Sequence, residues 1–98
     1  MTITKTQNET ALELALNGRL DTTTAPELEK ELASDLKGVT ELTLDCAGLD
    51  YISSSGLRVL LAAQKTMNNQ GSMIIKNVNE IIMEIFDVTG FSDILTIA

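Results

Sequence analysis

The chain has 98 residues, which is typical of one domain, and carries seven basic and fourteen acidic side chains, for a net charge of −7. It has no histidine, which excludes a Ser-His-Asp triad, a Cys-His dyad and imidazole metal ligands. The acidic balance argues against nucleic acid or an anionic membrane as a partner, and 44% apolar but only 3% aromatic residues predict an aliphatic core.

Location and domain number follow from similar observations. The single cysteine, Cys46, excludes an intrachain disulfide and favours a reducing compartment. The first ten residues lack the charged-then-apolar run of a signal peptide, and no segment approaches the roughly 20 apolar residues of a membrane span. We therefore expect a single domain over residues 1–98, in the cytoplasm and without membrane insertion.

Two alternating segments open the chain. Residues 1–7 are rich in threonine and indicate an edge strand, whereas residues 11–17 place three leucines on one face of a second strand. The polar residues between the two segments suit a hairpin turn. Residues 18–24 are expected to form a loop.

A helix is expected next. Thr24 and Glu27 have the spacing of a capping box, and Pro26 stands in the first turn, where its missing N–H costs nothing. Leucines then repeat every four residues, and Gly38 is placed to end the helix near residue 37. Residues 39–46 alternate again and predict a strand, followed by a loop over residues 48–55.

The second half of the chain continues the alternation of helix and strand. We expect a helix from residue 55 or 56 to about 69, a short buried strand over 73–76, and an amphipathic helix that ends at Gly90. Residues 94–97 are expected to add a last strand or turn. The order strand, strand, helix, strand, helix, strand, helix implies crossovers, so we expect an α/β fold with a mixed sheet and helices packed on it.

Three consecutive hydroxyls, on Ser53, Ser54 and Ser55, stand where the third strand gives way to the second helix. Capping accounts for them, because a serine at a helix start satisfies free N–H groups. A regulatory role uses the same physics, since a helix N-terminus accommodates an anion. A phosphoryl group on one of these serines would add about 1.5 to 2 negative charges to the surface without unfolding the domain.

Catalysis is not expected at these serines. A serine nucleophile needs a base, but there is no histidine, the G-x-S-x-G elbow is absent, and no motif brings Lys65 or Lys76 to the serines. The acidic residues of the helices predict solvated faces rather than a metal site, and Cys46 predicts a small buried apolar group. Asp21 follows the second strand, so its loop lies beside the serine loop if the two strands are parallel.

Three motifs in order resemble the STAS domain, and the most similar members are bacterial anti-sigma factor antagonists. The resemblance covers nearly the whole chain and implies the fold β-β-α-β-α-β-α, with helices packed on a mixed β-sheet, in a protein that is not an enzyme and needs no cofactor. The motifs are Gly18-Arg19-Leu20-Asp21, Tyr51-Ile52-Ser53-Ser54-Ser55-Gly56-Leu57 and Ile85-Phe86-Asp87-Val88-Thr89-Gly90-Phe91.

The resemblance also implies a switch. Family members bind an anti-sigma factor, often a serine kinase, and so release a sigma factor; phosphorylation of a loop serine blocks binding, and a metal-dependent serine phosphatase restores it. By motif position this serine is Ser54, and Asp21 is the acidic residue near it. Antagonists usually have an aspartate where this chain has Ser53, so Ser55 and then Ser53 are the alternatives. Within the family context, Ser55 is expected to cap the helix while Ser54 is modified.

The expected partner-binding surface comprises the Asp21 loop, the serine loop and the exposed face of the helix that follows. A second hypothesis within the same family is a STAS subunit of a transporter or sensory assembly, for instance beside an ATPase in lipid transport, which acts as a protein-binding scaffold without a covalent switch. The residues expected to contact a partner are Asp21, Thr22, Ser53, Ser54, Ser55, Gly56 and Arg58.

Overall fold

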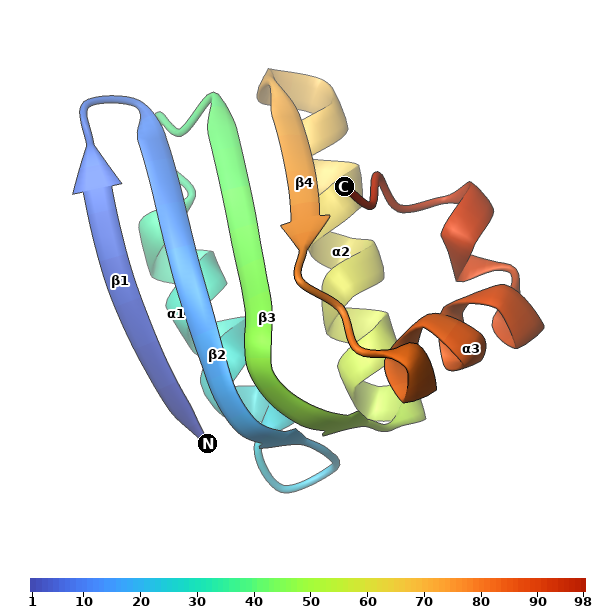
Figure 1. Ribbon diagram of the computed structural model, residues 1–98. Coiled ribbons are helices and arrows are strands. Elements are labelled where there is room, and N and C mark those ends of the chain that lie inside the picture. Colours follow the sequence, from blue (N-terminus) through green and yellow to red (C-terminus); the bar gives the residue numbers. More distant parts are fainter.

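A mixed sheet of four strands forms the centre of the computed structural model, which describes all 98 residues (Figure 1). The first two strands form an antiparallel hairpin, and the other two continue the sheet in parallel, so that the spatial order follows the chain order. The strands are β1 (Thr2–Asn8), β2 (Ala11–Leu20), β3 (Glu41–Ile52) and β4 (Ser72–Lys76).

Three helices connect or follow the parallel strands. Two of them, α1 and α2, lie behind the sheet, whereas α3 lies to one side, near the ends of β3 and β4 (Figure 1). The expected α/β class, the mixed sheet and the element order are therefore confirmed. The helices are α1 (Ala25–Asp35), α2 (Ser54–Gln70) and α3 (Glu80–Thr89).

The core lies between the sheet and its helices. Alternate leucines of β2 and β3 are fully buried on the helix side of the sheet, as period-two patterning predicts for a sheet with one covered face. Twenty-four buried apolar side chains form one continuous cluster, and Phe86 is its only aromatic member, so the prediction of an aliphatic core is confirmed.

Strands β2 and β3 are longer than the sequence predicts. Residues 18–20 and 48–52 are expected in loops, but Gly18 pairs with Leu49 and Leu20 pairs with Ile52. The pairing register shifts between Ala15 and Asn17 and again between Gly18 and Arg19, and such bulges break the alternation by which a strand is recognised. The extensions carry both loops to the same edge of the sheet.

The expected capping box at Thr24 is wrong. Thr24 is the N-cap residue of α1 but its side chain does not cap the helix. Its hydroxyl instead donates to the backbone oxygen of Arg19 (2.7 Å) and accepts from the backbone N–H of Asp21 (2.8 Å). The helix ends at Asp35, two residues earlier than predicted, and Gly38 follows with the positive φ of +78° that glycine tolerates.

The carboxyl-terminal residues complete the fold. As predicted, α3 ends at Gly90, which has a left-handed backbone, and a short 3-10 turn over Phe91–Asp93 follows. The expected last strand consists of a single parallel bridge between Ile97 and Ile75. None of the helices combines the length and the apolar character needed to cross a lipid bilayer.

Candidate functional site

The loops that follow β2 and β3 lie side by side at the end of the sheet where these two strands terminate. Because β2 and β3 are parallel, their carboxyl ends meet there, and the N–H of Ser53 donates to the backbone oxygen of Leu20 (2.9 Å). The hydroxyl oxygens of Thr22 and Ser55 are 3.4 Å apart and share a hydrogen bond. The structure thus brings together two segments that are separated by about thirty residues in the sequence.

Ser53, and not Ser55, caps helix α2. The backbone of Ser53 is extended, and its side-chain oxygen accepts a hydrogen bond from the N–H of Gly56 (3.4 Å). The bond to Leu20 fixes Ser53 at the end of β3, so its carbonyl accepts the first helical hydrogen bond, from Leu57 (2.9 Å). Serine and aspartate are both favoured N-cap residues, so Ser53 supplies the cap at a position where family members usually have an aspartate.

Ser54 differs from its two neighbours because its hydroxyl has no partner in the protein. The side chain is exposed, and it stands on the first helical residue of α2, where free N–H groups and the positive end of the helix dipole meet. Ser53 and Ser55 are half-buried and already hydrogen-bonded. Of the three hydroxyls, that of Ser54 is the most accessible to another protein.

Gly56 allows the first turn of α2 to pack closely against both strands. The residue is buried, and a Cβ atom at this position would lie 2.7 Å from Cγ of Leu20 and 2.8 Å from Cγ1 of Ile52. Both distances are shorter than carbon atoms tolerate. The glycine therefore positions the serines, and its own atoms are not on the exposed surface.

The carboxylate of Asp21 organises its own loop. Its Oδ1 atom accepts hydrogen bonds from the N–H groups of Thr23 (2.9 Å) and Thr24 (3.1 Å) and from the hydroxyl of Thr23 (2.7 Å). The bond from the Thr23 hydroxyl is the main reason why the pKa of Asp21 lies below its ordinary value, since each bond stabilises the ionised form. The side chain of Thr22, between these residues, remains exposed and reaches the serine loop.

A pair of basic residues flanks the site. Arg19 on β2 stacks on the ring of Tyr51 on β3, with its guanidinium carbon 4.4 Å from the ring centroid. Arg58 stands one helical turn after Ser54, is exposed and forms no ion pair within the protein. The Arg19–Tyr51 contact is missing from the sequence prediction, although both residues belong to the motifs that resemble the STAS domain.

Asn79 is a further residue that the sequence prediction misses. Its side-chain oxygen caps α3 by accepting from the N–H of Ile82 (2.8 Å), and its side-chain nitrogen donates to the backbone oxygen of Leu49 (3.0 Å). It therefore connects α3 to the extended part of β3, next to the serine loop. The signal that predicts this role is an asparagine directly before an amphipathic helix.

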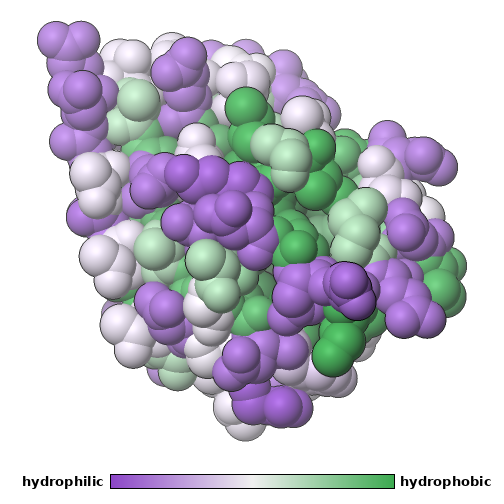
Figure 2. All heavy atoms as spheres, viewed as in Figure 1, coloured by the Kyte–Doolittle hydropathy of each residue, from purple (hydrophilic) through white to green (hydrophobic).

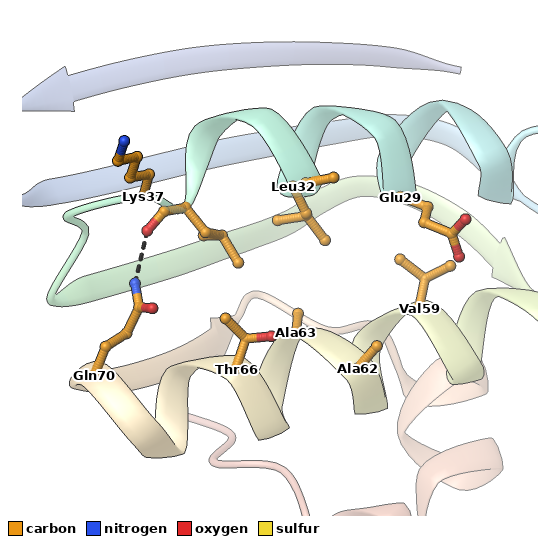
Figure 3. A pocket seen from close by; sticks show the side chains of 10 residues that line it. Glu29, Leu32, Lys37, Val59, Ala62, Ala63, Thr66 and Gln70 are labelled. Carbon is orange, nitrogen blue, oxygen red and sulfur yellow. Dashed lines mark hydrogen bonds between the residues drawn. The ribbon is translucent and has the colours of Figure 1, made fainter.

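A separate groove lies between α1 and α2, away from these loops (Figure 3). This groove of about 380 Å³ exists because α2 presents small side chains, Ala62 and Ala63, opposite Leu32 of α1. Gln70 closes one end by donating to the backbone oxygens of Leu36 (2.6 Å) and Val39 (2.7 Å). No residue of the serine loop or the Asp21 loop lines it.

Metal-binding and thiol chemistry have no support in the structure. No three cysteine, aspartate or glutamate side chains are grouped so that they could hold a metal ion. Cys46 is buried, and desolvation, with a smaller effect of the Asp45 charge, raises the pKa of its thiol to about 12. The site thus presents one exposed hydroxyl without a partner, that of Ser54, with the exposed Arg58 one helical turn further along α2.

Comparison with known proteins assigns the chain to a family. The model of the STAS domain matches residues 2–98, and the chain belongs to this family. BtrV of Bordetella bronchiseptica, which its name assigns to the anti-sigma factor antagonists, is 35% identical over 100% of this chain and 86% of its own length. The anti-sigma-B factor antagonist of Bacillus subtilis is 30% identical over 94% of this chain and 85% of its own length.

Solved structures confirm the fold. An anti-sigma factor antagonist from Mycobacterium paratuberculosis superposes with a TM-score of 0.88 and 18% identity, over 98% of this chain and 83% of that one. SpoIIAA, solved in unphosphorylated and phosphorylated forms, gives TM-scores of 0.78 and 0.77 with 16% and 17% identity, over 99% of this chain and 87% and 91% of those chains. The predicted resemblance to STAS domains is confirmed.

Proposed function

We propose that this protein is an anti-sigma factor antagonist that binds a kinase-type anti-sigma factor when it is unphosphorylated and is released from it by phosphorylation of Ser54. Relatives named as antagonists, aligned over nearly the full chain, support the first part. The free, exposed hydroxyl of Ser54 carries the second part, because neither neighbouring serine has an unengaged oxygen. Such a protein is a regulatory binding partner and not an enzyme.

The chemistry of the switch takes place on one oxygen. The kinase transfers the γ-phosphoryl group of ATP to Oγ of Ser54: the new O–P bond forms, the bond to the bridging oxygen of ADP breaks, and the hydroxyl proton passes to a base of the kinase. A metal-dependent serine phosphatase in the cytoplasm reverses the modification by transferring the phosphoryl group to water. The antagonist supplies only the acceptor hydroxyl and the surface that the two enzymes recognise.

The local structure supports a modification that alters binding but not folding. A phosphoryl group on Ser54 adds about 1.5 to 2 negative charges, which the N–H groups at the start of α2 accommodate. Arg58, one turn further along, is unpaired and within reach of this charge. A partner surface shaped around a neutral hydroxyl and a free Arg58 would then meet a dianion and an engaged cation.

The proposed contact surface consists of the exposed parts of both loops and the start of α2. Asp21 and Gly56 contribute by holding the loop and the helix in place, since the carboxylate is occupied by threonines and the glycine is buried. Ser53 contributes through the cap, and Ser55 through its bond to Thr22. The groups proposed to touch the partner directly are the side chains of Thr22, Ser54 and Arg58.

Binding assays with the kinase-type anti-sigma factor of the same genome test the proposal. We expect Ser54→Ala to bind as tightly as the unmodified protein and to be insensitive to ATP, whereas Ser54→Asp binds at least about tenfold more weakly. Ser72→Asp is the matched control, because Ser72 is exposed and begins β4, at the end of the sheet away from the serine loop. Equal binding by Ser54→Ala and Ser54→Asp would contradict the switch.

A second measurement separates the switch from the scaffold hypothesis. Intact-mass analysis of protein from growing cells should show a fraction heavier by one phosphoryl group, mapped by fragmentation to Ser54 in the tryptic peptide that ends at Arg58. Unmodified protein under all growth conditions, together with a co-purifying transport ATPase, would instead identify a STAS subunit of a transporter.

A further inference from the structure

Helix α3 leaves an apolar stripe on the surface. Its buried face consists of Ile82 and Phe86, but Ile81 is 63% exposed and Val88 is 81% exposed, with half-buried Ile85 between them. Spacings of four and three residues place Ile81, Ile85 and Val88 on one side of the helix. We refer to these three residues as the α3 stripe. In Figure 2, green apolar atoms lie among purple polar ones over this helix.

The α3 stripe is hollowed. An open hollow of about 330 Å³ is lined by the three stripe residues together with Glu84 and Thr89. Such a hollow seats an apolar side chain of a partner, and apolar anchors of this kind dominate the recognition of an amphipathic helix. Single exposed apolar residues are ordinary on a protein surface, whereas an aligned and hollowed set indicates an interaction site.

The charges beside the stripe indicate what kind of partner fits. Helix α3 contains three acidic residues, Glu80, Glu84 and Asp87, and neither lysine nor arginine. All three are exposed, and none forms an ion pair within the protein. At about 100° of rotation per residue they lie on the side of the helix opposite Ile82 and Phe86, so they edge the stripe toward solvent.

We propose that the α3 stripe docks an amphipathic helix of a partner protein whose apolar ridge is edged by lysine or arginine. A second copy of this chain fits poorly, because its α3 would bring three more carboxylates and no cation to the contact. A basic edge would instead pair with Glu84 and Asp87 while the ridge fills the hollow. This surface contains no residue of the serine loop, so the proposal can be tested independently of the Ser54 switch.

Two synthetic helical peptides with the same leucine ridge, one edged with lysine and one with glutamate, test the proposal. Fluorescence anisotropy should show at least about tenfold tighter binding of the lysine-edged peptide, with amide shift changes centred on residues 80–89. The double variant Ile81→Gln/Val88→Gln should abolish this binding. Ile74→Gln is the matched control, because Ile74 is an isoleucine that is 39% exposed but belongs to β4.

Reversing the charges of α3 tests separately whether its acidic residues select the peptide. Glu84→Lys/Asp87→Lys should weaken binding of the lysine-edged peptide by about fivefold and strengthen binding of the glutamate-edged peptide. Equal binding of both peptides, binding of neither, or shift changes outside α3 would overturn the proposal. It would also fail if sedimentation equilibrium showed a dimer that Ile81→Gln/Val88→Gln dissociates, because a second copy would then occupy the stripe.

Discussion

The guanidinium of Arg19 links the end of β3 to the Asp21 loop, since it stacks on Tyr51 and also lies near the carboxylate of Asp21. The contact to Tyr51 crosses the β2–β3 pair one residue before both strands end, and Nε of Arg19 is 3.8 Å from Oδ2 of Asp21. Because the arginine side chain is 61% exposed, water screens its charge. These contacts should fix the Asp21 loop relative to β3 more than they add to the stability of the fold.

We therefore expect a small but measurable coupling between Arg19 and Tyr51. A double-mutant cycle with Arg19→Ala and Tyr51→Leu, measured by urea unfolding, should give a coupling free energy of about 0.5–1 kcal/mol. Arg19→Lys should lose most of it, because lysine lacks the planar group that stacks on the ring. A coupling energy indistinguishable from zero would show that the two side chains are merely adjacent.

Gly56→Ala tests the packing of α2 on the strands. The added methyl group collides with Leu20 and Ile52, so we expect the free energy of unfolding to fall by about 1–3 kcal/mol, measured by urea unfolding. The control is Ser54→Ala in the same helical turn, which should change stability by less than about 0.5 kcal/mol because the side chain is exposed. A Gly56→Ala variant as stable as this control would mean that the strand ends move aside freely.

The lowered pKa of Asp21 can be tested by removing the hydroxyl of Thr23, which is its main cause. Carbon-detected NMR titration should give a pKa for this carboxyl below its ordinary value of 3.8, and Thr23→Val should raise it toward that value. Because the folded-state pKa is lowered, the hydrogen bonds of the loop persist above pH 3.8 and are lost as the pH falls through the lowered pKa. Amide exchange of Thr23 and Thr24 should accelerate in that range, and an unchanged pKa in Thr23→Val would exclude the hydroxyl as its cause.

Because the thiol of Cys46 is buried, we expect the free energy of unfolding to fall at alkaline pH. Its thiol has a pKa of about 12 in the folded protein against 9.0 ordinarily, so the stabilisation is complete below pH 9 and is lost as the pH rises toward 12. By about pH 10.5 this group alone should reduce the free energy of unfolding by roughly 2 kcal/mol. Urea unfolding of Cys46→Ala should show a correspondingly shallower decline over the same range, and parallel declines would contradict the prediction.

Much of the fold could be predicted because the leucines of β2, β3 and α1 keep regular periods. The bounds of β2 and β3 could not, since their last residues pair only after shifts near Asn17 and Gly48 that depend on the neighbouring strand. Gly48 leaves room for the side chain of Asn17, and this fit between two strands has no local signature. Asp21 likewise accepts the N–H of Thr24, which a capping box would assign to the side chain of Glu27.

The candidate site could be located from the sequence, but the roles of its serines could not be assigned. All three serines suit an N-cap chemically, and the choice of Ser53 depends on its N–H bond to Leu20, more than thirty residues earlier in the chain. The same long-range pairing explains why Ser55 meets Thr22 and why Ser54 remains free. Arg19 and Tyr51 are similarly ordinary in sequence and become neighbours only through strand pairing.

The short bridge at the carboxyl terminus limits how copies of this domain could polymerise. The tail occupies the outer edge of β4 near the carboxyl end of the strand, where Ile75 donates its N–H to Thr96 and accepts from Ala98, both at 2.9 Å. Strand-by-strand growth into a filament needs two open edges on each molecule, and only β1 offers a fully open one. Pairing between β1 strands would therefore stop at two molecules, because the tail blocks the addition of a further strand to β4.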